Sequence, residues 1–258
     1  MSERFANKVA IITGSTSGIG KATAVRIARE GSAVCIVANR NAEGGELTVC
    51  QIRDAGGRAL FVQADVGKVE DCQLIRHKTV EAFGRVDILV NNAGITRGGP
   101  LEELEESFYN HVMDTNLKSA FFMSRAVIRD LLAAGNASVT TVSSVHAQAT
   151  RSRSSVYAAT KAGMVGMTRS LAVEFGDRGV RFNCILPGTI DTRQYPRDNA
   201  PVDHATWKPR ASDVQVMKRL GTPEEIAAVI CFLSSDEASF CTGETWAVDG
   251  GLLCHLKD

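Results

Sequence analysis

The chain has 258 residues, of which 44% are hydrophobic and 22% are charged, a composition typical of a folded globular protein. Lysine and arginine together number 29, as do aspartate and glutamate, so the formal net charge is zero. This balance excludes the basic excess with which proteins bind nucleic acids or membrane surfaces. The length is ordinary for a single α/β domain. We therefore expect a small-molecule partner rather than a nucleic acid or a membrane.

The cysteines and the chain's apolar runs indicate its environment. Seven cysteines are scattered without C-x-x-C spacing, so we expect free thiols and no metal site. A first strand is expected to begin by Lys8, which leaves no room for a secretory signal peptide. No apolar run approaches the ~20 residues of a membrane span. These features predict a reduced, cytoplasmic protein.

The first motif with chemical meaning is a glycine-rich turn between an apolar strand, KVAIIT (8–13), and a helix. The turn holds three glycines and three hydroxyl side chains: Gly14, Ser15, Thr16, Ser17, Gly18 and Gly20. Glycines let the main chain turn tightly and approach a pyrophosphate, whose charge the positive helix N-terminus favours. The spacing G-x-x-x-G-x-G differs from the G-x-G-x-x-G dinucleotide fingerprint. A plain turn without a ligand is the alternative.

The second strand, Ala33–Ala38, ends at the position where dinucleotide-binding units meet the adenosine ribose. NAD-preferring sites commonly place an acidic residue there, whereas an arginine accommodates the 2′-phosphate of NADP. Asn39 and Arg40 stand here, so the sequence favours NADP(H). In the alternative, Arg40 is a solvated loop cation and Asn39 bonds a plain ribose.

Strands and helices then alternate along the chain. The pattern predicts a helix over 42–55, a strand over 59–66, a helix over 68–83 and a strand over 86–94. Alternation at these lengths indicates parallel strands with helices on both faces of the sheet. Asp65, Val66 and the segment 92–94 fall at strand ends, on the same edge as the glycine turn. A long helix is expected over roughly 101–133, with Asn116 as a mild misfit inside it.

The stretch from Ser144 to Lys161 contains the most reactive side chains. Tyr157 and Lys161 are four residues apart, so on a helix they lie on one face. A phenol has a pKa near ~10, and a neighbouring ammonium group draws that pKa toward neutral pH. Ser144 follows the apolar strand 138–142, at the edge where α/β sheets build their sites. Taken alone, a tyrosine and a lysine at this spacing are usually surface residues.

The C-terminal third completes one α/β unit spanning residues 1–258. A strand over 180–186 ends at Pro187 and Gly188, and a helix over 223–234 and a strand over 245–248 follow. The irregular segment 189–219 is long for a loop in a compact domain, so we predict that it forms a substrate loop.

In order and spacing, these motifs resemble the short-chain dehydrogenase/reductase family along the whole chain. The matching segments are TGSTSGIG (13–20), ADV (64–66), NNAG (91–94), Asn116, VSS (142–144), YAATK (157–161), Pro187-Gly188 and VDGG (248–251). The resemblance implies a single-domain, Rossmann-type, doubly wound sheet of about seven parallel strands. It also implies a homotetramer or a homodimer.

The resemblance implies an NAD(P)(H)-dependent oxidoreductase that moves a hydride between nicotinamide and a ketone or secondary alcohol. The implied catalytic residues are Asn116, Ser144, Tyr157 and Lys161. Ser144 and Tyr157 would hold the substrate oxygen, Tyr157 would move the proton, and Lys161 would bind the ribose. Asn116 would keep a water in a proton relay. The implied cofactor residues are Gly14, Ser15, Thr16, Ser17, Gly18, Ile19, Gly20, Asn39, Arg40, Asp65, Val66, Asn92, Ala93, Gly94, Tyr157, Lys161, Pro187, Gly188, Ile190 and Thr192.

Similarity to 3-oxoacyl-carrier-protein reductases and to sugar dehydrogenases is comparable, so the substrate stays open. A different class of function is a non-catalytic dinucleotide-binding sensor of redox state, although such proteins typically lose the tyrosine or the lysine. Three basic residues, His146, Arg151 and Arg153, are expected near the substrate end of the site. They predict an anionic or polyhydroxylated substrate; a solvated loop or a subunit contact is the alternative.

Overall fold

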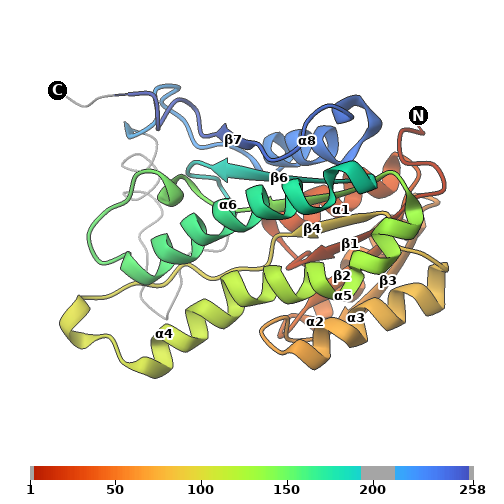
Figure 1. Cartoon of the computed structure of the whole chain (residues 1–258), viewed down its shortest axis with the longest axis horizontal. Helices are drawn as coiled ribbons and strands as arrows, with labels where there is room; N and C mark the ends of the chain where they lie inside the picture. Colours follow the sequence, from red (N-terminus) through yellow and green to blue (C-terminus); the bar gives the residue numbers. More distant parts are fainter. Residues whose placement is uncertain (1–2, 193–212, 256–258) are drawn as a thin grey trace.

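A computed structural model describes residues 3–192 and 213–255. These residues form one seven-stranded sheet in the order β3-β2-β1-β4-β5-β6-β7 (Figure 1). All neighbouring strands run parallel. The strands are β1 (Val9–Thr13), β2 (Ala33–Ala38), β3 (Arg58–Gln63), β4 (Ile88–Asn91), β5 (Ala137–Val142), β6 (Val180–Pro187) and β7 (Thr245–Val248). The predicted doubly wound α/β fold of about seven strands is confirmed.

Helices cover both faces of the sheet. One face carries α1 (Gly18–Arg29), α2 (Ala42–Asp54) and α8 (Pro223–Ser234). The other carries α3 (Val69–Phe83), α5 (Ser119–Ala134) and α6 (Ser155–Phe175), which lie in front of the strands in Figure 1. The described chain also contains α4 (Glu106–Met113) and short helical turns η1 (Leu101–Glu103), η3 (Val145–Ala147), η4 (Gly176–Arg178) and η5 (Asp236–Ala238). Within the described ranges, no helix has both the length and the apolar character needed to cross a bilayer.

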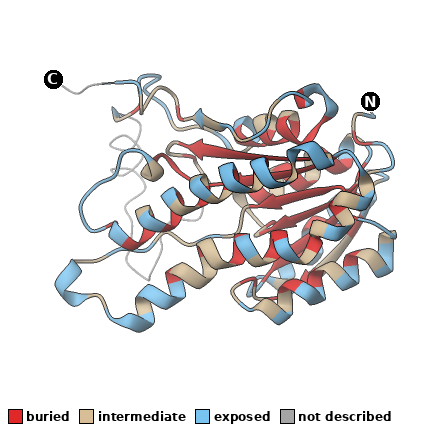
Figure 2. Ribbon diagram, viewed as in Figure 1, coloured by how far each residue is buried: buried red, intermediate tan, exposed pale blue. Residues whose placement is uncertain are grey.

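The central strands are buried on both sides, as Figure 2 shows. In β1, Ile12 packs into the core beneath α1, α2 and α8, whereas Ile11 packs into the core beneath α3, α5 and α6. Successive side chains of a strand point to opposite faces, so a strand covered on both sides is apolar at nearly every position. That requirement explains the continuous apolar runs in the sequence.

Two predicted strands are shorter in the structure because side chains capture main-chain groups at their ends. β3 ends at Gln63, and the N–H of Asp65 donates to the Asp71 carboxylate at 2.7 Å. β4 ends at Asn91, and the N–H groups of Asn92 and Ala93 both donate to the Thr13 hydroxyl at 3.0 Å. The segments predicted as strand ends are therefore loops at the C-terminal edge of the sheet.

The predicted helix over 101–133 is also interrupted. Its first residues form the separate turn η1, and α4 and α5 are joined by the π-helical segment η2 (Asp114–Lys118). Asn116 lies in this segment and is fully buried. π-Helical turns are rare and often occur at functional sites. The misfit of Asn116 in a helical pattern thus coincides with a real break in the α-helical ladder.

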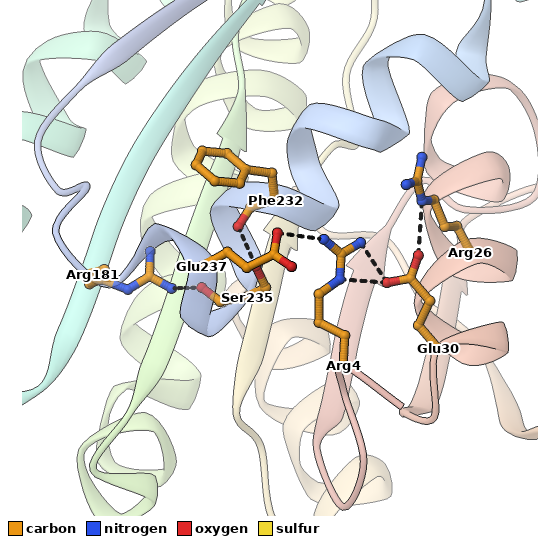
Figure 3. A network of polar contacts seen from close by, with 7 residues as sticks. All are labelled: Arg4, Arg26, Glu30, Arg181, Phe232, Ser235 and Glu237. Carbon is orange, nitrogen blue, oxygen red and sulfur yellow. Dashed lines mark hydrogen bonds and ion pairs between the residues drawn. The ribbon is translucent and has the colours of Figure 1, made fainter. Parts of the chain in front are cut away.

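The opposite edge of the sheet is held by charged groups (Figure 3). Arg4 pairs with Glu30 at the end of α1 and, at 3.1 Å, with Glu237 in η5. Arg181 at the start of β6 donates to the carbonyl oxygen of Ser235 at 2.9 Å. These contacts tie the N-terminal segment and the end of α8 together, away from the edge that carries the chemical motifs.

Candidate active site

A cavity of about 520 Å³ opens at the C-terminal edge of the sheet and contains most of the candidate residues. Its described lining comes from the glycine turn, the end of β4, the segment after β5, α6 and the segment after β6. The predicted residues in this lining are Gly14, Ser17, Gly18, Ile19, Asn92, Ala93, Gly94, Ser144, Tyr157, Lys161, Pro187, Gly188, Ile190 and Thr192.

The glycine turn is shaped by contacts that leave no room for side chains. Gly14 has a φ of +63°, and a Cβ there would lie 2.9 Å from the Cα of Ala93. A Cβ at Gly20 would collide with the carbonyl oxygen of Gly14 and lie 2.5 Å from the amide nitrogen of Asn92. That amide donates to the carbonyl oxygen of Gly14 at 3.0 Å. The turn is therefore packed directly against the segment after β4.

The turn presents the N-terminus of α1 to the cavity. Gly18 and Ile19, the first residues of this helix, line the space, and its first turn holds no acidic residue. Free main-chain N–H groups and the helix dipole favour a phosphate at such a position. Ser15 acts differently: its buried hydroxyl donates to Ile12 and accepts from the N–H of Val37. It braces the turn between β1 and β2.

The residues predicted to meet the adenosine lie at the ends of β2 and β3. Asn39 and Arg40 are exposed, and the carbonyl oxygen of Asn39 accepts from Gln63 at 2.9 Å. Asp65 accepts from the N–H of Gly67, and Val66 is buried. A further contact, 3.4 Å from Asn41 to Thr16, links this region to the glycine turn. These residues are not in the described lining of the cavity, but they lie at the same edge of the sheet, because parallel strands end at one edge.

Tyr157 and Lys161 lie one turn apart in α6, as their spacing predicts. Tyr157 is 8% exposed and Lys161 4% exposed. The Lys161 ammonium group lies 5.6 Å from the centre of the phenol ring and donates to the carbonyl oxygen of Val142 at 2.9 Å. The end of β5 thus holds the cation beside the phenol in a nearly water-free position. Burial at this depth strengthens the influence of the charge on its neighbour.

Ser144 and His146 line the same cavity as Tyr157. The Ser144 hydroxyl oxygen accepts from the N–H of His146 at 3.2 Å, which leaves the hydroxyl hydrogen to donate elsewhere. The His146 ring meets the edge of the Tyr157 ring, with centres 5.3 Å apart, and its Nδ1 lies 2.8 Å from the Thr150 hydroxyl. Burial, and then the charge of Arg151, lower the pKa of His146, so the imidazole is neutral at pH 7.

Asn116 is buried and is not in the described lining of the cavity, but its side chain supports the neighbouring chain. Its side chain accepts from the N–H of Ile95 at 2.8 Å and donates to the carbonyl oxygen of Ile95 at 3.0 Å. It also lies 3.2 Å from the Thr160 hydroxyl. A Cβ at Gly94 would lie 3.3 Å from Asn116 and 3.5 Å from the Lys161 nitrogen, so all three positions adjoin. The π-helical segment thereby fixes the chain that follows β4.

Several supporting residues have contacts that the sequence motifs do not reveal. Ser143 donates to the carbonyl oxygen of Lys161 at 2.7 Å, and Thr160 donates to that of Tyr157 at 2.7 Å. Gln215 is buried and accepts from the N–H of Thr189 at 3.0 Å, which holds the chain after the Pro187-Gly188 turn. Each contact joins a hydroxyl or an amide to a main-chain group, and only the folded structure reveals the pairing.

Of the three basic residues expected near the substrate, His146 and Arg151 line the cavity and Arg153 lies outside its described lining. Residues 193–212 of the predicted substrate loop lie outside the described residues. Among the residues on either side of that gap, no three His, Cys, Asp or Glu side chains gather in a way that could hold a metal ion.

Comparison with known proteins gives a consistent result. Residues 14–253 match the family model described as enoyl-(acyl carrier protein) reductase. The chain is 40% identical over 252 residues to the cis-4-hydroxycyclohexanecarboxylate dehydrogenase of Sinomonas cyclohexanicum, covering 97% of this chain and 98% of that protein.

Two solved structures share the fold over nearly the full length. A short-chain dehydrogenase from Burkholderia cenocepacia in complex with NADP has a TM-score of 0.89 and 32% identity, covering 97% of this chain and 99% of that chain. Carveol dehydrogenase from Mycobacterium avium in complex with NAD has a TM-score of 0.90 and 28% identity, covering 98% and 99%. With these matches and the geometry above, the chain belongs to the short-chain dehydrogenase/reductase family.

Proposed function

We propose that this protein is an NAD(P)(H)-dependent oxidoreductase that interconverts a ketone and the corresponding secondary alcohol. The observation that carries the proposal is that Ser144, Tyr157 and Lys161 line the same cavity as the glycine turn. A dinucleotide site and a set of acid–base side chains therefore share one space. The dehydrogenase names of similar proteins support the same class of reaction.

The cavity fits a nicotinamide dinucleotide. Its volume, about 520 Å³, is in the range of cofactor sites, and none of its described lining residues is acidic. The start of α1 at Gly18 and Ile19 suits the pyrophosphate, and the segment from Pro187 to Thr192 suits the nicotinamide end. When bound, the nicotinamide supplies or accepts the hydride.

The side chains of the cavity then hold the substrate oxygen and move a proton. Ser144 donates a hydrogen bond to that oxygen through its hydroxyl hydrogen, while its hydroxyl oxygen accepts from the N–H of His146. Tyr157 gives the oxygen a proton during reduction and removes it during oxidation. The nearby Lys161 cation favours negative charge on the phenol oxygen during this transfer. Donors fixed in advance around a developing alkoxide contribute a large part of such a rate enhancement.

Asn116 acts mainly as a positioning residue in this proposal. Its amide is committed to Ile95 and Thr160. The predicted relay toward Lys161 would therefore need a polar group other than this amide to hold its water.

We propose that NADP(H) is preferred over NAD(H). No acidic residue follows β2, and Arg40 is exposed beside the expected ribose position. Replacing Arg40 with methionine should raise the KM for NADPH by about tenfold, the value of one charge-assisted hydrogen bond. The KM for NADH should not change. An equal change for both coenzymes would leave Asn39 and a plain ribose as the better explanation.

We also propose that the protein assembles as a homodimer or homotetramer. The outer side of α5 and α6 carries a second cavity of about 630 Å³, lined by apolar residues that include Leu117, Phe122 and Met167. Phe121 is 46% exposed beside it. Light scattering of the wild type should show a dimer or tetramer, and Phe121→Glu should shift it toward the monomer.

The central test is a panel of ketones and secondary alcohols, cis-4-hydroxycyclohexanecarboxylate among them, assayed with NADPH/NADP and with NADH/NAD. Tyr157→Phe should abolish turnover while coenzyme binding persists. Tyr109→Phe, an exposed position in α4, is the matched control and should retain full activity. A non-catalytic redox sensor would show no turnover with any substrate, and Tyr157→Phe would leave its coenzyme response unchanged.

A further inference from the structure

The described lining of the cavity carries positive charge and no negative charge. Lys161 and Arg151 are cations in the described lining, and His146 is a neutral base beside them. Aspartate and glutamate are absent from that described lining. The N-terminus of α1 at the glycine turn suits the phosphates of the coenzyme, and Lys161 lies beside Tyr157. Arg151 is assigned to neither group and needs a separate explanation.

Arg151 is exposed and lines the same cavity as Ser144 and Tyr157. It belongs to the loop 148–154, which leaves Ser144 and returns to Tyr157 at the start of α6. Its charge acts on His146, whose ring touches that of Tyr157. His146 is therefore a neighbour of both Arg151 and Tyr157, and all three residues line one cavity.

The loop that carries Arg151 is held at both ends. At its start, the N–H groups of Gln148 and Ala149 both donate to the carbonyl oxygen of Val145 at 3.0 Å. At its end, Gly98 passes so close to the carbonyl oxygen of Arg153 that a Cβ at Gly98 would overlap it. A guanidinium group on a braced loop loses less freedom on binding a ligand than one on a free loop.

Of the two cations in the described lining, Lys161 and Arg151, Arg151 is the one in a position to bind a ligand. The Lys161 ammonium group is engaged by Val142 and lies beside the phenol. Around Arg151, no described carboxylate lies within ion-pair distance. A guanidinium group presents two parallel N–H donors that match the two oxygens of a carboxylate.

We propose that the substrate is a hydroxy acid, or the corresponding keto acid, whose carboxylate binds Arg151 while its hydroxyl or carbonyl oxygen lies between Ser144 and Tyr157. This inference rests on the proposed function of the same site. A single guanidinium beside a neutral imidazole suits one negative charge better than the double charge of a phosphate ester. Arg151 is then the residue that determines specificity, and it takes no part in proton transfer.

The first experiment measures binding without turnover. Cyclohexanecarboxylate and benzoate are titrated by calorimetry into the NADP-saturated protein, and the neutral cyclohexanecarboxamide and benzamide serve as matched ligands. We expect the carboxylates to bind at least tenfold more tightly than the amides, and Arg151→Met to remove this preference. Arg153→Met, in the same loop but outside the described cavity lining, should keep it. Equal binding of acids and amides by the wild type would overturn the inference.

The second experiment measures turnover with matched pairs, in which each hydroxy acid of the substrate panel is compared with its methyl amide. Arg151→Met should lower kcat/KM for the acids by at least tenfold, mainly through KM, and leave the amides unchanged. Arg151→Lys should restore part of the loss. Turnover that does not distinguish acids from amides would overturn this inference and leave the proposed function standing. Selective carboxylate binding without any turnover would overturn the proposed function, and the assignment of a substrate with it, and leave Arg151 only as a carboxylate-binding residue.

Discussion

The Ser143 hydroxyl donates a hydrogen bond of 2.7 Å to the main-chain carbonyl oxygen of Lys161. The residue directly before Ser144 thus holds the helical turn that carries the lysine. Two parts of the site that are far apart in sequence, the end of β5 and the first turns of α6, are joined by this contact. The same strand end also binds the Lys161 ammonium group through Val142.

Replacing Ser143 with alanine should therefore lower kcat in addition to lowering the free energy of unfolding. We expect kcat to fall by about tenfold, because loss of one buried hydrogen bond corresponds to about 1.4 kcal/mol in the positioning of Lys161. Steady-state kinetics, together with urea unfolding, measure both effects.

Ser138→Ala is the matched control for this change. Ser138 is also buried in β5, and its hydroxyl donates to the carbonyl oxygen of Ser234 at 3.3 Å, at the other end of the strand. Both variants should lose about 1 kcal/mol of unfolding free energy, but only Ser143→Ala should lose activity. Equal kcat values in the two variants would show that the contact to Lys161 has no part in positioning it.

The glycine turn offers a second prediction. In Gly20→Ala, the new methyl group would meet the carbonyl oxygen of Gly14 and the amide of Asn92. We expect a loss of about 2 kcal/mol in stability from this overpacking, and coenzyme binding weakened by at least tenfold. Thermal unfolding with and without NADPH gives both quantities.

Gly166→Ala should have the opposite effect. Gly166 lies within α6, and a Cβ there would meet nothing within 4 Å. Alanine favours a helix over glycine by about 0.5–1 kcal/mol, so this variant should be stabilised and bind NADPH normally. A Gly20→Ala protein that is as stable and as active as Gly166→Ala would contradict the tight packing of the turn.

Features of the site that depend on neighbouring residues can be predicted from the sequence. Contacts between residues far apart in the chain cannot. The positions of Tyr157 and Lys161 on one helix face depend only on their spacing, and the strand-turn-helix around Gly14 depends only on neighbouring residues. By contrast, the contacts of Ser143 and Thr160 pair a common hydroxyl with a main-chain oxygen, which no residue pattern specifies. The π-helical break at Asn116 coincides with its bonds to Ile95, twenty-one positions earlier in the chain. Such a pairing requires the folded sheet.

A third prediction concerns pH and Glu225 at the start of α8. Hydrogen bonds from Arg219, and then from the N–H of Thr222, lower the pKa of Glu225 from 4.5 to about 2. Because the pKa is lower in the folded state, the stabilising effect is present above pH 4.5 and is lost as the pH falls toward 2. Glu225 is 43% exposed, so its charge contributes below about 1 kcal/mol.

Glu225→Gln keeps a side chain able to cap the helix but removes the charge. The difference in unfolding free energy between wild type and variant should be measurable at pH 7 and shrink steadily below pH 4.5. Urea unfolding at pH 7, 5, 4 and 3 tests this, with Glu224→Gln as the neighbouring control. A difference that stays constant over that range would exclude the ion pair with Arg219 as its cause.

The last prediction concerns Arg181, which is 8% exposed at the start of β6. Its guanidinium group donates to the carbonyl oxygens of Leu233 at 2.8 Å and Ser235 at 2.9 Å, at the C-terminal end of α8. A cation is favoured at this negative end of a helix, although burial lowers the pKa of Arg181. The residue therefore joins the edge strands to the helix that covers them.

Arg181→Met fills a similar volume but leaves these carbonyl oxygens buried without donors. We expect a loss of about 3 kcal/mol in unfolding free energy. The Michaelis constants should not change, because the cavity lies at the other end of β6, about 20 Å along the strand. Arg129→Met, at an exposed position of α5, should change stability by less than about 0.5 kcal/mol. If Arg181→Met instead altered the KM for substrate at unchanged stability, the two edges of the sheet would have to be coupled, since no contact of Arg181 reaches the cavity directly.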